Sequence, residues 1–456
     1  MTEFDLEDLK KLLTPRNYLE EFIDHIRTHY KLDECYTFRF DTMIEKWFQY
    51  DDGYYKQVPI QQIYSVYWNI PFTTKTSNTK LSHCIKWLEA ETQFDGKWMD
   101  HDPNYDNCLN GIVNITTHKL LSHTPRMMFK HQVPRNFDSL EGQLIPKQFA
   151  TALECIPNEQ QREYFLKFFL NTIHKRFEDE VFLMLYGVKG AGKSTLIQIF
   201  SCMFGPAMTS HTSLNKLGGT FGKSAMYDKR VNCEPDLPIV PLYPNAISEI
   251  KKITGEDGEL EVSLKFRTPF NYPVSCFNIF GINQLMGFTD DAEKEIDSIM
   301  RRVVLVNCPN MMLKDAEFKK LMRSPKFLDK LYSWAMWAPC YPIYEPEEEE
   351  EWIRHNKELW LLNSNPILKI LQEEFEFCPT DYDETEEGVR IYQEKQKVKC
   401  TEVREVVADR LEEEGYLVPT QIRKAITEAL KTMKIYRGDT TGTKASYENI
   451  VRRAKP

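Results

Sequence analysis

The segment GVKGAGKS, residues 187–194, limits the possible folds of this chain more than any other part of its sequence. It matches the pattern GxxxxGK[ST], in which glycines let backbone N–H groups approach phosphate oxygens closely. The run VFLMLY, residues 181–186, precedes it without alternation, which is typical of a strand covered on both faces of a parallel sheet. The helical run STLIQIF follows. A buried strand, a glycine-rich loop and a helix in this order predict an α/β fold with a phosphate-binding loop.

This loop predicts the side chains that bind ATP and Mg²⁺. Lys193 is expected to reach the β- and γ-phosphates, and the hydroxyl of Ser194 is expected to bind Mg²⁺. The start of the following helix adds partial positive charge at the same place. The expected ATP-binding residues are Gly187, Gly190, Ala191, Gly192, Lys193, Ser194 and Thr195.

A phosphate site of this kind needs an acidic residue at the end of a neighbouring strand, to hold the metal and orient the attacking water. The segment KRVNCEPD, residues 229–236, supplies one after a short apolar strand. Glu234 is the residue we expect to polarise water and to take part in metal binding. Asp236 is a second candidate metal ligand, but its place between Pro235 and Pro238 is equally typical of a turn residue.

Two further elements are typical of ATPases that assemble into rings. The strand SCFNIFGI, residues 275–282, is followed by Asn283, a polar side chain placed to sense the γ-phosphate. Arg301 and Arg302 precede the next strand, VVLVNC, where an arginine can reach the nucleotide of an adjacent subunit and stabilise transition-state charge. A plain pair of surface arginines is the alternative.

The segment IKKITGEDGELEVSLKFRTPFNYP, residues 250–273, predicts a helix followed by a β-hairpin. Gly255 and Gly258 break the helix, and residues 259–267 alternate in polarity. The hairpin carries Lys265 and Arg267, which in a ring can follow the phosphates of single-stranded DNA through the pore.

The order of these motifs resembles that of the superfamily-three helicases, and within them the poxvirus-type primase-helicases of phages, plasmids and large DNA viruses. The resemblance spans roughly residues 181–309 and rests on GVKGAGKST, KRVNCEPD, the ITGED hairpin segment, the strand before Asn283 and DSIMRRVVLV. NGIVNITTHKLL, from Asn110, resembles the start of the domain that precedes the helicase in this family. The resemblance implies an AAA+-like core in a hexameric ring, which uses ATP to translocate on single-stranded DNA, usually 3′ to 5′, and to unwind duplex.

The resemblance also assigns roles to individual residues. Lys193 and Ser194 take the roles of the first motif and Glu234 that of the second, while Asn283 is the sensor. Lys265 falls in the DNA-binding hairpin, and Arg302 matches the arginine finger better than Arg301 does.

The chain departs from the family pattern in two places. Many relatives have two adjacent acids in the second motif, whereas Pro235 follows Glu234 here, which leaves the metal role of Asp236 open. Relatives often carry an N-terminal primase, for which the segment before Asn110 is too short. The expectation is therefore a stand-alone helicase or a fragment of a larger primase-helicase.

The sequence predicts that the chain divides into four segments. Residues 1–150 form an N-terminal domain, mixed α/β or mostly helical, with a strand-turn-strand unit over 46–58. Residues 151–344 form the ATPase domain, and residues 345–364 an acidic linker that contains Glu347–Glu351. Residues 365–456 contain two helical stretches and a hairpin over 434–452, which together resemble a winged helix-turn-helix.

Charge and hydropathy restrict the location and the partners. The formal charge is −10, but Gly415–Pro456 has 9 basic and 3 acidic residues, the right sign for phosphate backbones. A solvated tail or a protein contact is the alternative for that segment. No long apolar stretch and no basic-then-apolar leader are present, so we expect no membrane contact and a place in the cytoplasm, that of the host if a phage or plasmid encodes the chain.

The function that these observations favour is a ring-forming replicative DNA helicase. Its expected partners are single-stranded and forked DNA, further copies of the chain in a hexamer, and a primase or polymerase. The sequence leaves open an ATP-gated origin-binding initiator, and also a protein remodeller, a packaging motor or an RNA helicase.

Overall fold

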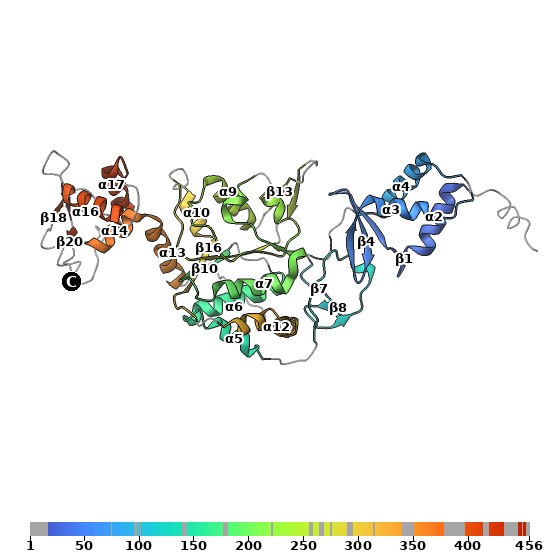
Figure 1. The fold of residues 1–456 in the computed structure, drawn as a ribbon, viewed down its shortest axis with the longest axis horizontal. Helices are drawn as coiled ribbons and strands as arrows, with labels where there is room; N and C mark the ends of the chain where they lie inside the picture. Colours follow the sequence, from blue (N-terminus) through green and yellow to red (C-terminus); the bar gives the residue numbers. More distant parts are fainter. Residues whose placement is uncertain are drawn as a thin grey trace, which may run out of the picture.

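The computed structural model arranges the chain as a central α/β domain with a smaller module on either side (Figure 1). No helix among the described residues combines the length and hydrophobicity that a membrane crossing requires. The cysteines of the described residues are free thiols. The structure describes residues 17–73, 75–94, 98, 100, 102–138, 144–176, 181–219, 222–254, 259–263, 269–273, 276–289, 295–312, 315–339, 351–377, 397–413, 419–432, 446–448 and 450–452.

The N-terminal module packs helices α2, α3 and α4 on a four-stranded sheet of order β5-β4-β3-β6. The expected strand-turn-strand unit is present, because β4 pairs antiparallel with β5 across a turn in which Asp52 and Gly53 both have positive φ. The elements are α2 (Tyr18–His29), β1 (Lys31–Leu32), β2 (Cys35–Tyr36), β3 (Phe38–Asp41), β4 (Lys46–Asp51), β5 (Tyr54–Val58), α3 (Ile60–Trp68), α4 (Asn78–Thr92) and β6 (Gln93–Phe94).

A small antiparallel sheet of order β7-β8-β9 follows the N-terminal module. It contains the NGIVNITTHKLL segment, in which β8 begins at Gly111 and pairs antiparallel with β9. The elements are β7 (Tyr105–Cys108), β8 (Gly111–Asn114), β9 (Leu120–Leu121) and the 3-10 turn η2 (Pro125–Met127).

The central domain is built on a five-stranded sheet of order β11-β12-β15-β10-β16, in which every pairing is parallel. This confirms a mixed α/β fold with a parallel sheet around the glycine-rich loop. The elements are α5 (Lys147–Leu153), α6 (Glu159–His174), β10 (Phe182–Gly187), α7 (Lys193–Met208), β11 (Thr209–Ser210), α8 (Leu214–Leu217), η3 (Lys223–Ala225), β12 (Val231–Glu234), α9 (Pro244–Thr254), β13 (Glu259–Val262), β14 (Phe270–Pro273), β15 (Phe277–Ile282), α10 (Ile296–Met300), β16 (Val303–Cys308), α11 (Ala316–Met322) and α12 (Pro325–Trp337).

Helices cover both faces of this sheet, which explains the continuous apolar run in β10. Leu183 and Leu185 face one hydrophobic core, formed with helices α5, α6, α7, α11 and α12. Phe182 and Met184 face the other, formed with α8, α9, α10 and the β13–β14 hairpin. The hairpin and α11 therefore lie on opposite faces of the sheet, as Figure 1 also shows for β13 and α12.

The segment predicted as an acidic linker contains a packed helix, α13 (Glu351–Ser364). Trp352 and Ile353 enter the first core, while Trp360 is fully buried in the second and donates its indole N–H to the carbonyl of Met286 at 2.8 Å. The run of glutamates favoured an exposed linker, although the apolar residues of the segment pack into the two cores. This part of the segment thus belongs to the central domain, and the domain boundaries themselves stay predictions.

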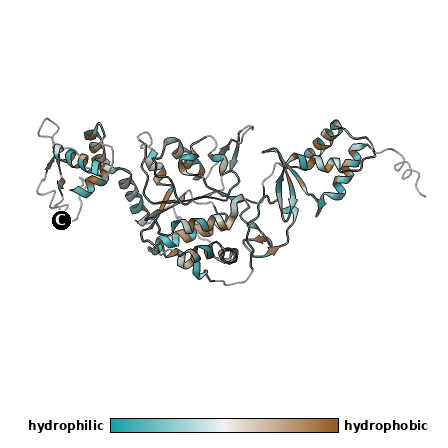
Figure 2. Ribbon diagram, in the orientation of Figure 1, coloured by the Kyte–Doolittle hydropathy of each residue, from teal (hydrophilic) through white to brown (hydrophobic). Residues whose placement is uncertain are grey.

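The C-terminal module has its own hydrophobic core, built from α14, α16, α17 and short strands. Its helices and those of the N-terminal module show a brown side and a teal side in Figure 2, as amphipathic helices do. The elements are α14 (Pro366–Glu374), β17 (Phe375–Phe377), β18 (Lys397–Lys399), α16 (Cys400–Glu413), α17 (Ile422–Thr432), β19 (Ser446–Glu448) and β20 (Ile450–Arg452).

The strands at the end of this module pair differently from the sequence expectation. A hairpin was expected within residues 434–452, but β19 pairs with β18 and β20 pairs with β17, both from earlier in the chain. Residues 434–445 lie outside the described residues. The pairing partners are distant in sequence, so local alternation could not identify them.

A buried ion cluster joins the β7-β8-β9 sheet to the central domain. Asp106 of β7 accepts two hydrogen bonds from the guanidinium of Arg230, at 2.9 and 2.6 Å, and one from the hydroxyl of Tyr332 at 2.8 Å. The ammonium of Lys175 lies 3.4 Å from the same carboxylate. Arg230 directly precedes β12, so this cluster fixes the strand that ends in Glu234.

Candidate functional site

The glycine-rich loop lies at the carboxyl end of β10 and leads directly into α7. Gly187 has φ 149° and passes so close to β16 that an added Cβ would lie 2.0 Å from the carbonyl oxygen of Cys308. Gly192 has φ 98° and stands at the N-cap of α7, where it turns the chain into the helix. These two positions require glycine, and they aim the start of α7 at the loop.

The side chain of Lys193 lies buried inside this loop. Its ammonium donates to the carbonyl oxygens of Gly187 at 2.7 Å and Val188 at 2.9 Å, and to the Oδ1 atom of Asn283 at 2.9 Å. All three acceptors are neutral. Burial lowers the pKa of Lys193, against the opposing effect of nearby Cys308 and Asp236. Among the described residues the buried cation therefore has no full counter-charge in direct contact, and an anion such as a phosphate would supply one.

Asn283 connects Lys193 to Asp236. Its amide nitrogen donates to Oδ1 of Asp236 at 3.1 Å, while its Oδ1 accepts from Lys193. Asn283 follows β15, which lies between β10 and β12, so the three residues form a row across the carboxyl ends of neighbouring strands. Ligands of open parallel sheets bind at these ends, where successive connections leave in opposite directions.

The other predicted nucleotide residues lie around this row. Glu234 ends β12 and is half-buried, with register opposite Phe280 of β15. Ser194 is exposed at the first turn of α7 and Thr195 is half-buried, while Gly190 is exposed and Ala191 is buried. The structure therefore brings Lys193, Asn283 and Asp236 into contact, and places Glu234 on the strand next to that of Asn283.

The donor set at this site suits Mg²⁺ bound together with phosphates. Among the described residues, no group of three or more His, Cys, Asp or Glu side chains gathers in a way that holds a metal alone. Mg²⁺ is usually bound through one or two carboxylates plus water and substrate phosphates. Asp236, Glu234 and the Ser194 hydroxyl fit that pattern and do not fit a cage made by protein alone.

Arg301 and Arg302 lie far from the phosphate loop of their own chain. β16 pairs in register with β10 from Phe182 opposite Val303 to Gly187 opposite Cys308, so the arginines stand at the other end of the sheet. Five residue steps correspond to about 17 Å. Arg301 is exposed, and Arg302 is half-buried with its NH1 group donating to the carbonyl of Ser298 at 3.1 Å.

The expected hairpin is present, because β13 pairs antiparallel with β14 from Glu259 opposite Pro273 to Val262 opposite Phe270. Lys265 and Arg267 belong to the connection between these strands and lie outside the described residues. The register places this connection directly beyond the Val262–Phe270 pair.

A second ion cluster anchors the base of the hairpin and was not found from the sequence. Tyr272 of β14 donates its hydroxyl to Asp228 at 3.1 Å. The other oxygen of Asp228 lies 2.8 Å from the ammonium of Lys130 and 2.9 Å from the Nε2 atom of His131. His131 lies 97 positions and Tyr272 44 positions from Asp228 in the sequence, and no local motif marks them. Asp228 has a positive φ of 63°, which the sequence does not reveal.

Two family models match the chain. A family described as D5 N terminal like matches residues 24–168, and a family of unknown function, DUF5906, matches residues 185–302. The second match contains most of the candidate nucleotide residues, from Gly187 to Asn283, and both arginines. No curated protein matches the chain significantly.

Solved structures of one protein cover nearly the whole chain. The apo structure of the NrS-1 C-terminal region (305-718) is 13% identical, with a TM-score of 0.48, and covers 96% of this chain and 100% of that chain. The A form apo structure of the same region is 12% identical, with the same TM-score and coverage. Similarity at this level carries no argument about function. The match to the D5 N terminal like family fits the phage and viral replication primase-helicases that the sequence motifs resemble.

Proposed function

We propose that the chain is an ATP-dependent replicative DNA helicase of superfamily three. In this proposal an AAA+-like core hydrolyses ATP, subunits assemble into a hexameric ring, and the ring moves 3′ to 5′ along single-stranded DNA to unwind forks. The site of action is the cytoplasm of the cell that replicates the phage, plasmid or viral genome.

The observation that carries the proposal is the buried ammonium of Lys193 with three neutral acceptors. Burying an ammonium is costly unless it is both hydrogen-bonded and paired with an opposite charge, and here only the hydrogen bonds are present. The helix α7 begins at this point, and its free N–H groups add to the positive potential. A triphosphate satisfies both, since its oxygens accept from the ammonium and from the loop backbone.

The remaining residues have separate roles in ATP hydrolysis. Glu234 accepts a hydrogen bond from the attacking water and orients it toward the γ-phosphorus. Asn283 contacts Lys193 and Asp236 at once, so a change at the γ-phosphate alters a hydrogen bond on β15. Mg²⁺ held by Ser194 and Asp236 would neutralise charge on the β- and γ-phosphates.

The position of Arg302 supports assembly into a ring. Within one chain it stands at the amino ends of the strands, whereas Lys193 and Asn283 gather at the carboxyl ends. An arginine at that edge can complete a nucleotide site only on a neighbouring subunit. The winged-helix-like module and the hairpin with Lys265 and Arg267 then supply contacts to DNA phosphates.

We expect Arg302→Ala subunits to inhibit wild-type subunits when the two are mixed. The pure variant should lose about 10³-fold or more in ATP hydrolysis, the range seen for arginine fingers. In mixtures the ATPase rate should fall faster than the fraction of wild-type subunits, because each variant subunit disables a neighbour's site and, in a ring whose sites act in turn, one disabled site also stops the others.

The adjacent, exposed Arg301 offers a matched control for this titration. Arg301→Ala should leave the ATPase rate at the wild-type level at every mixing ratio. If Arg302→Ala alone hydrolyses ATP at the wild-type rate, the proposed role of Arg302 is wrong, and a strictly proportional decline in its mixtures would mean that the sites do not act in turn.

Single-stranded DNA should stimulate ATP hydrolysis by the wild-type chain. The variant Glu234→Gln should bind ATP but fail to hydrolyse it. The amide keeps the shape of the side chain but polarises water poorly, so we expect normal ATP binding with a loss of about 10²-fold or more in turnover. Radiolabelled ATP filter binding and phosphate release measure the two. ATP hydrolysis that duplex or single-stranded DNA leaves unchanged would favour a protein remodeller.

A further inference from the structure

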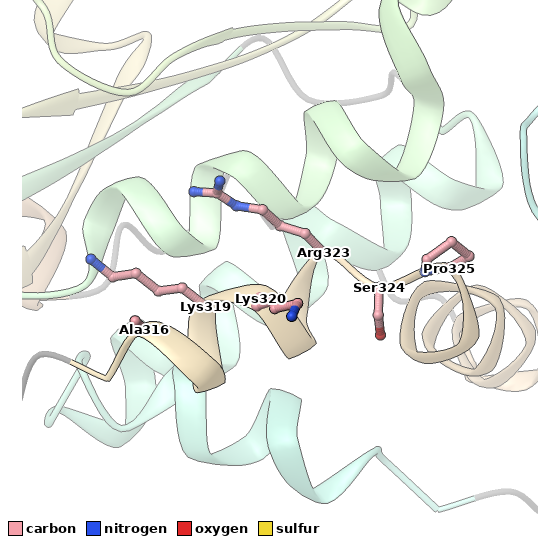
Figure 3. A pocket seen from close by; sticks show the side chains of 6 residues that line it. All are labelled: Ala316, Lys319, Lys320, Arg323, Ser324 and Pro325. Carbon is pink, nitrogen blue, oxygen red and sulfur yellow. The ribbon is translucent and has the colours of Figure 1, made fainter.

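A hollow on the surface of the central domain is lined by α11, the turn after it and the first residue of α12 (Figure 3). Three of its six lining residues are cations, and none is acidic. The lining residues are Ala316, Lys319, Lys320, Arg323, Ser324 and Pro325.

The cations share one face of α11. Positions 316, 319, 320 and 323 follow the spacing of neighbours on one side of a helix, whereas Phe318 and Met322 pack against the core. Lys319, Lys320 and Arg323 are exposed. In the described part of the chain no ion pair involves them, and Arg323 donates only to the neutral side-chain oxygen of Gln198.

The acidic residues of these two helices are placed elsewhere. Asp315 caps α11 by accepting from the backbone N–H of Phe318, and Asp329 accepts from the side chain of Asn136. Glu317 lies about 100° around the helix from Ala316, away from the centre of the face that lines the hollow, although it is the neighbour of Lys320 three positions on. The lining itself contains three cations and no acid, so the hollow attracts an external anion.

The extent of the charge indicates a polyanion. Lys319 to Arg323 spans about 6 Å along the helix axis, and α12, whose first residue lines the hollow, carries two further exposed cations, Lys326 and Lys330. One phosphate group cannot contact this whole row, whereas a nucleic-acid backbone carries a negative charge at every nucleotide.

We propose that this hollow, with Lys319, Lys320 and Arg323, binds the sugar–phosphate backbone of a nucleic acid. The site is separate from the β13–β14 hairpin, since α11 packs on one face of the sheet and the hairpin on the other. Given the proposed helicase function, the strand or duplex arm held here is a different segment from the one at the hairpin. Arg323 also contacts α7, the helix that begins at Lys193, so nucleic acid bound here touches the nucleotide domain directly.

The test compares the triple variant K319A/K320A/R323A with a charge-matched control, K86A/K119A/K147A, which removes three exposed lysines at scattered positions. Fluorescence anisotropy with labelled single-stranded and duplex oligonucleotides gives the affinity over a range of salt, without ATP. We expect the triple variant to bind at least about tenfold more weakly at low salt, with a salt slope smaller by about 2 for three contacts to a single strand. The control should bind as the wild type does, and thermal melting checks the fold of both.

Three results would overturn the proposal. Equal losses in both variants would mean that only overall charge matters, and unchanged binding in the triple variant would remove the site. Tripolyphosphate serves as a competitor: if it displaces the oligonucleotide from wild type and triple variant equally, the hollow is not the shared phosphate site. Because the assay needs no hydrolysis, failure here leaves the helicase proposal standing, and absence of unwinding leaves this result standing.

Discussion

Replacing Lys193 by alanine should abolish ATP hydrolysis, with a loss of about 10²-fold at the least, the effect of removing one well-placed donor in an active site. The ammonium lies within the loop, and its hydrogen-bond acceptors in the described part of the chain are all neutral, so its main energetic contribution is expected with phosphates bound. For the same reason the folded state should lose little stability. Steady-state phosphate release and thermal melting measure the two effects.

Lys189 provides the matched control, since it belongs to the same loop but is exposed. Lys189→Ala should keep most of the ATPase activity. Normal turnover in Lys193→Ala would contradict the site assignment, and a large drop in its melting temperature would show that the lysine is structural.

Replacing Asp106 by asparagine should destabilise the protein by about 3–5 kcal/mol, the usual cost of breaking a buried ion pair from one side. The carboxylate is the shared partner of Arg230, Lys175 and Tyr332. Without it, two buried cations lose their counter-charge. The urea midpoint of unfolding should fall accordingly, whereas Asp409→Asn on the exposed side of α16 should change it little.

The same cluster makes stability depend on acid. Burial alone would raise the pKa of Asp106, but the charges of Arg230 and Lys175 outweigh it and hold the pKa at about 2, below the ordinary 3.8. Because the folded-state pKa is depressed, this stabilisation is present above about pH 4 and is lost as pH falls toward 2. Asp106→Asn should lack this part of the pH dependence, and an unchanged profile would contradict the assigned role.

The sequence predicted the glycine-rich loop and the strands around it because their signals are local. An apolar run before GVKGAGKS marks a buried strand, and polar residues directly after two other strands marked Glu234 and Asn283. All of these strands are parallel, so their carboxyl ends must meet at one edge. The contact of Asn283 with both Lys193 and Asp236 follows from that geometry.

Features that depend on distant pairs could not be predicted in this way. Asp106 and Arg230 are separated by 124 positions, and nothing near either residue identifies its partner. The pairing of β20 with β17 in the C-terminal module has the same cause. In α13 the apolar residues are close together in sequence, but the run of five glutamates favoured an exposed linker. Trp352 and Trp360 are nevertheless buried.

Strand displacement on a forked DNA duplex tests directly whether the chain is an ATP-dependent DNA helicase. A fluorophore and a quencher on the two strands of the fork report separation as it occurs, with wild-type chain, Mg²⁺ and ATP. We expect ATP-dependent separation of a fork with a 3′ single-stranded arm on the loading strand. We expect no strand separation with Lys193→Ala or with a non-hydrolysable ATP analogue. DNA-stimulated ATP hydrolysis without any strand separation, on forks with either arm, would contradict the proposed helicase function.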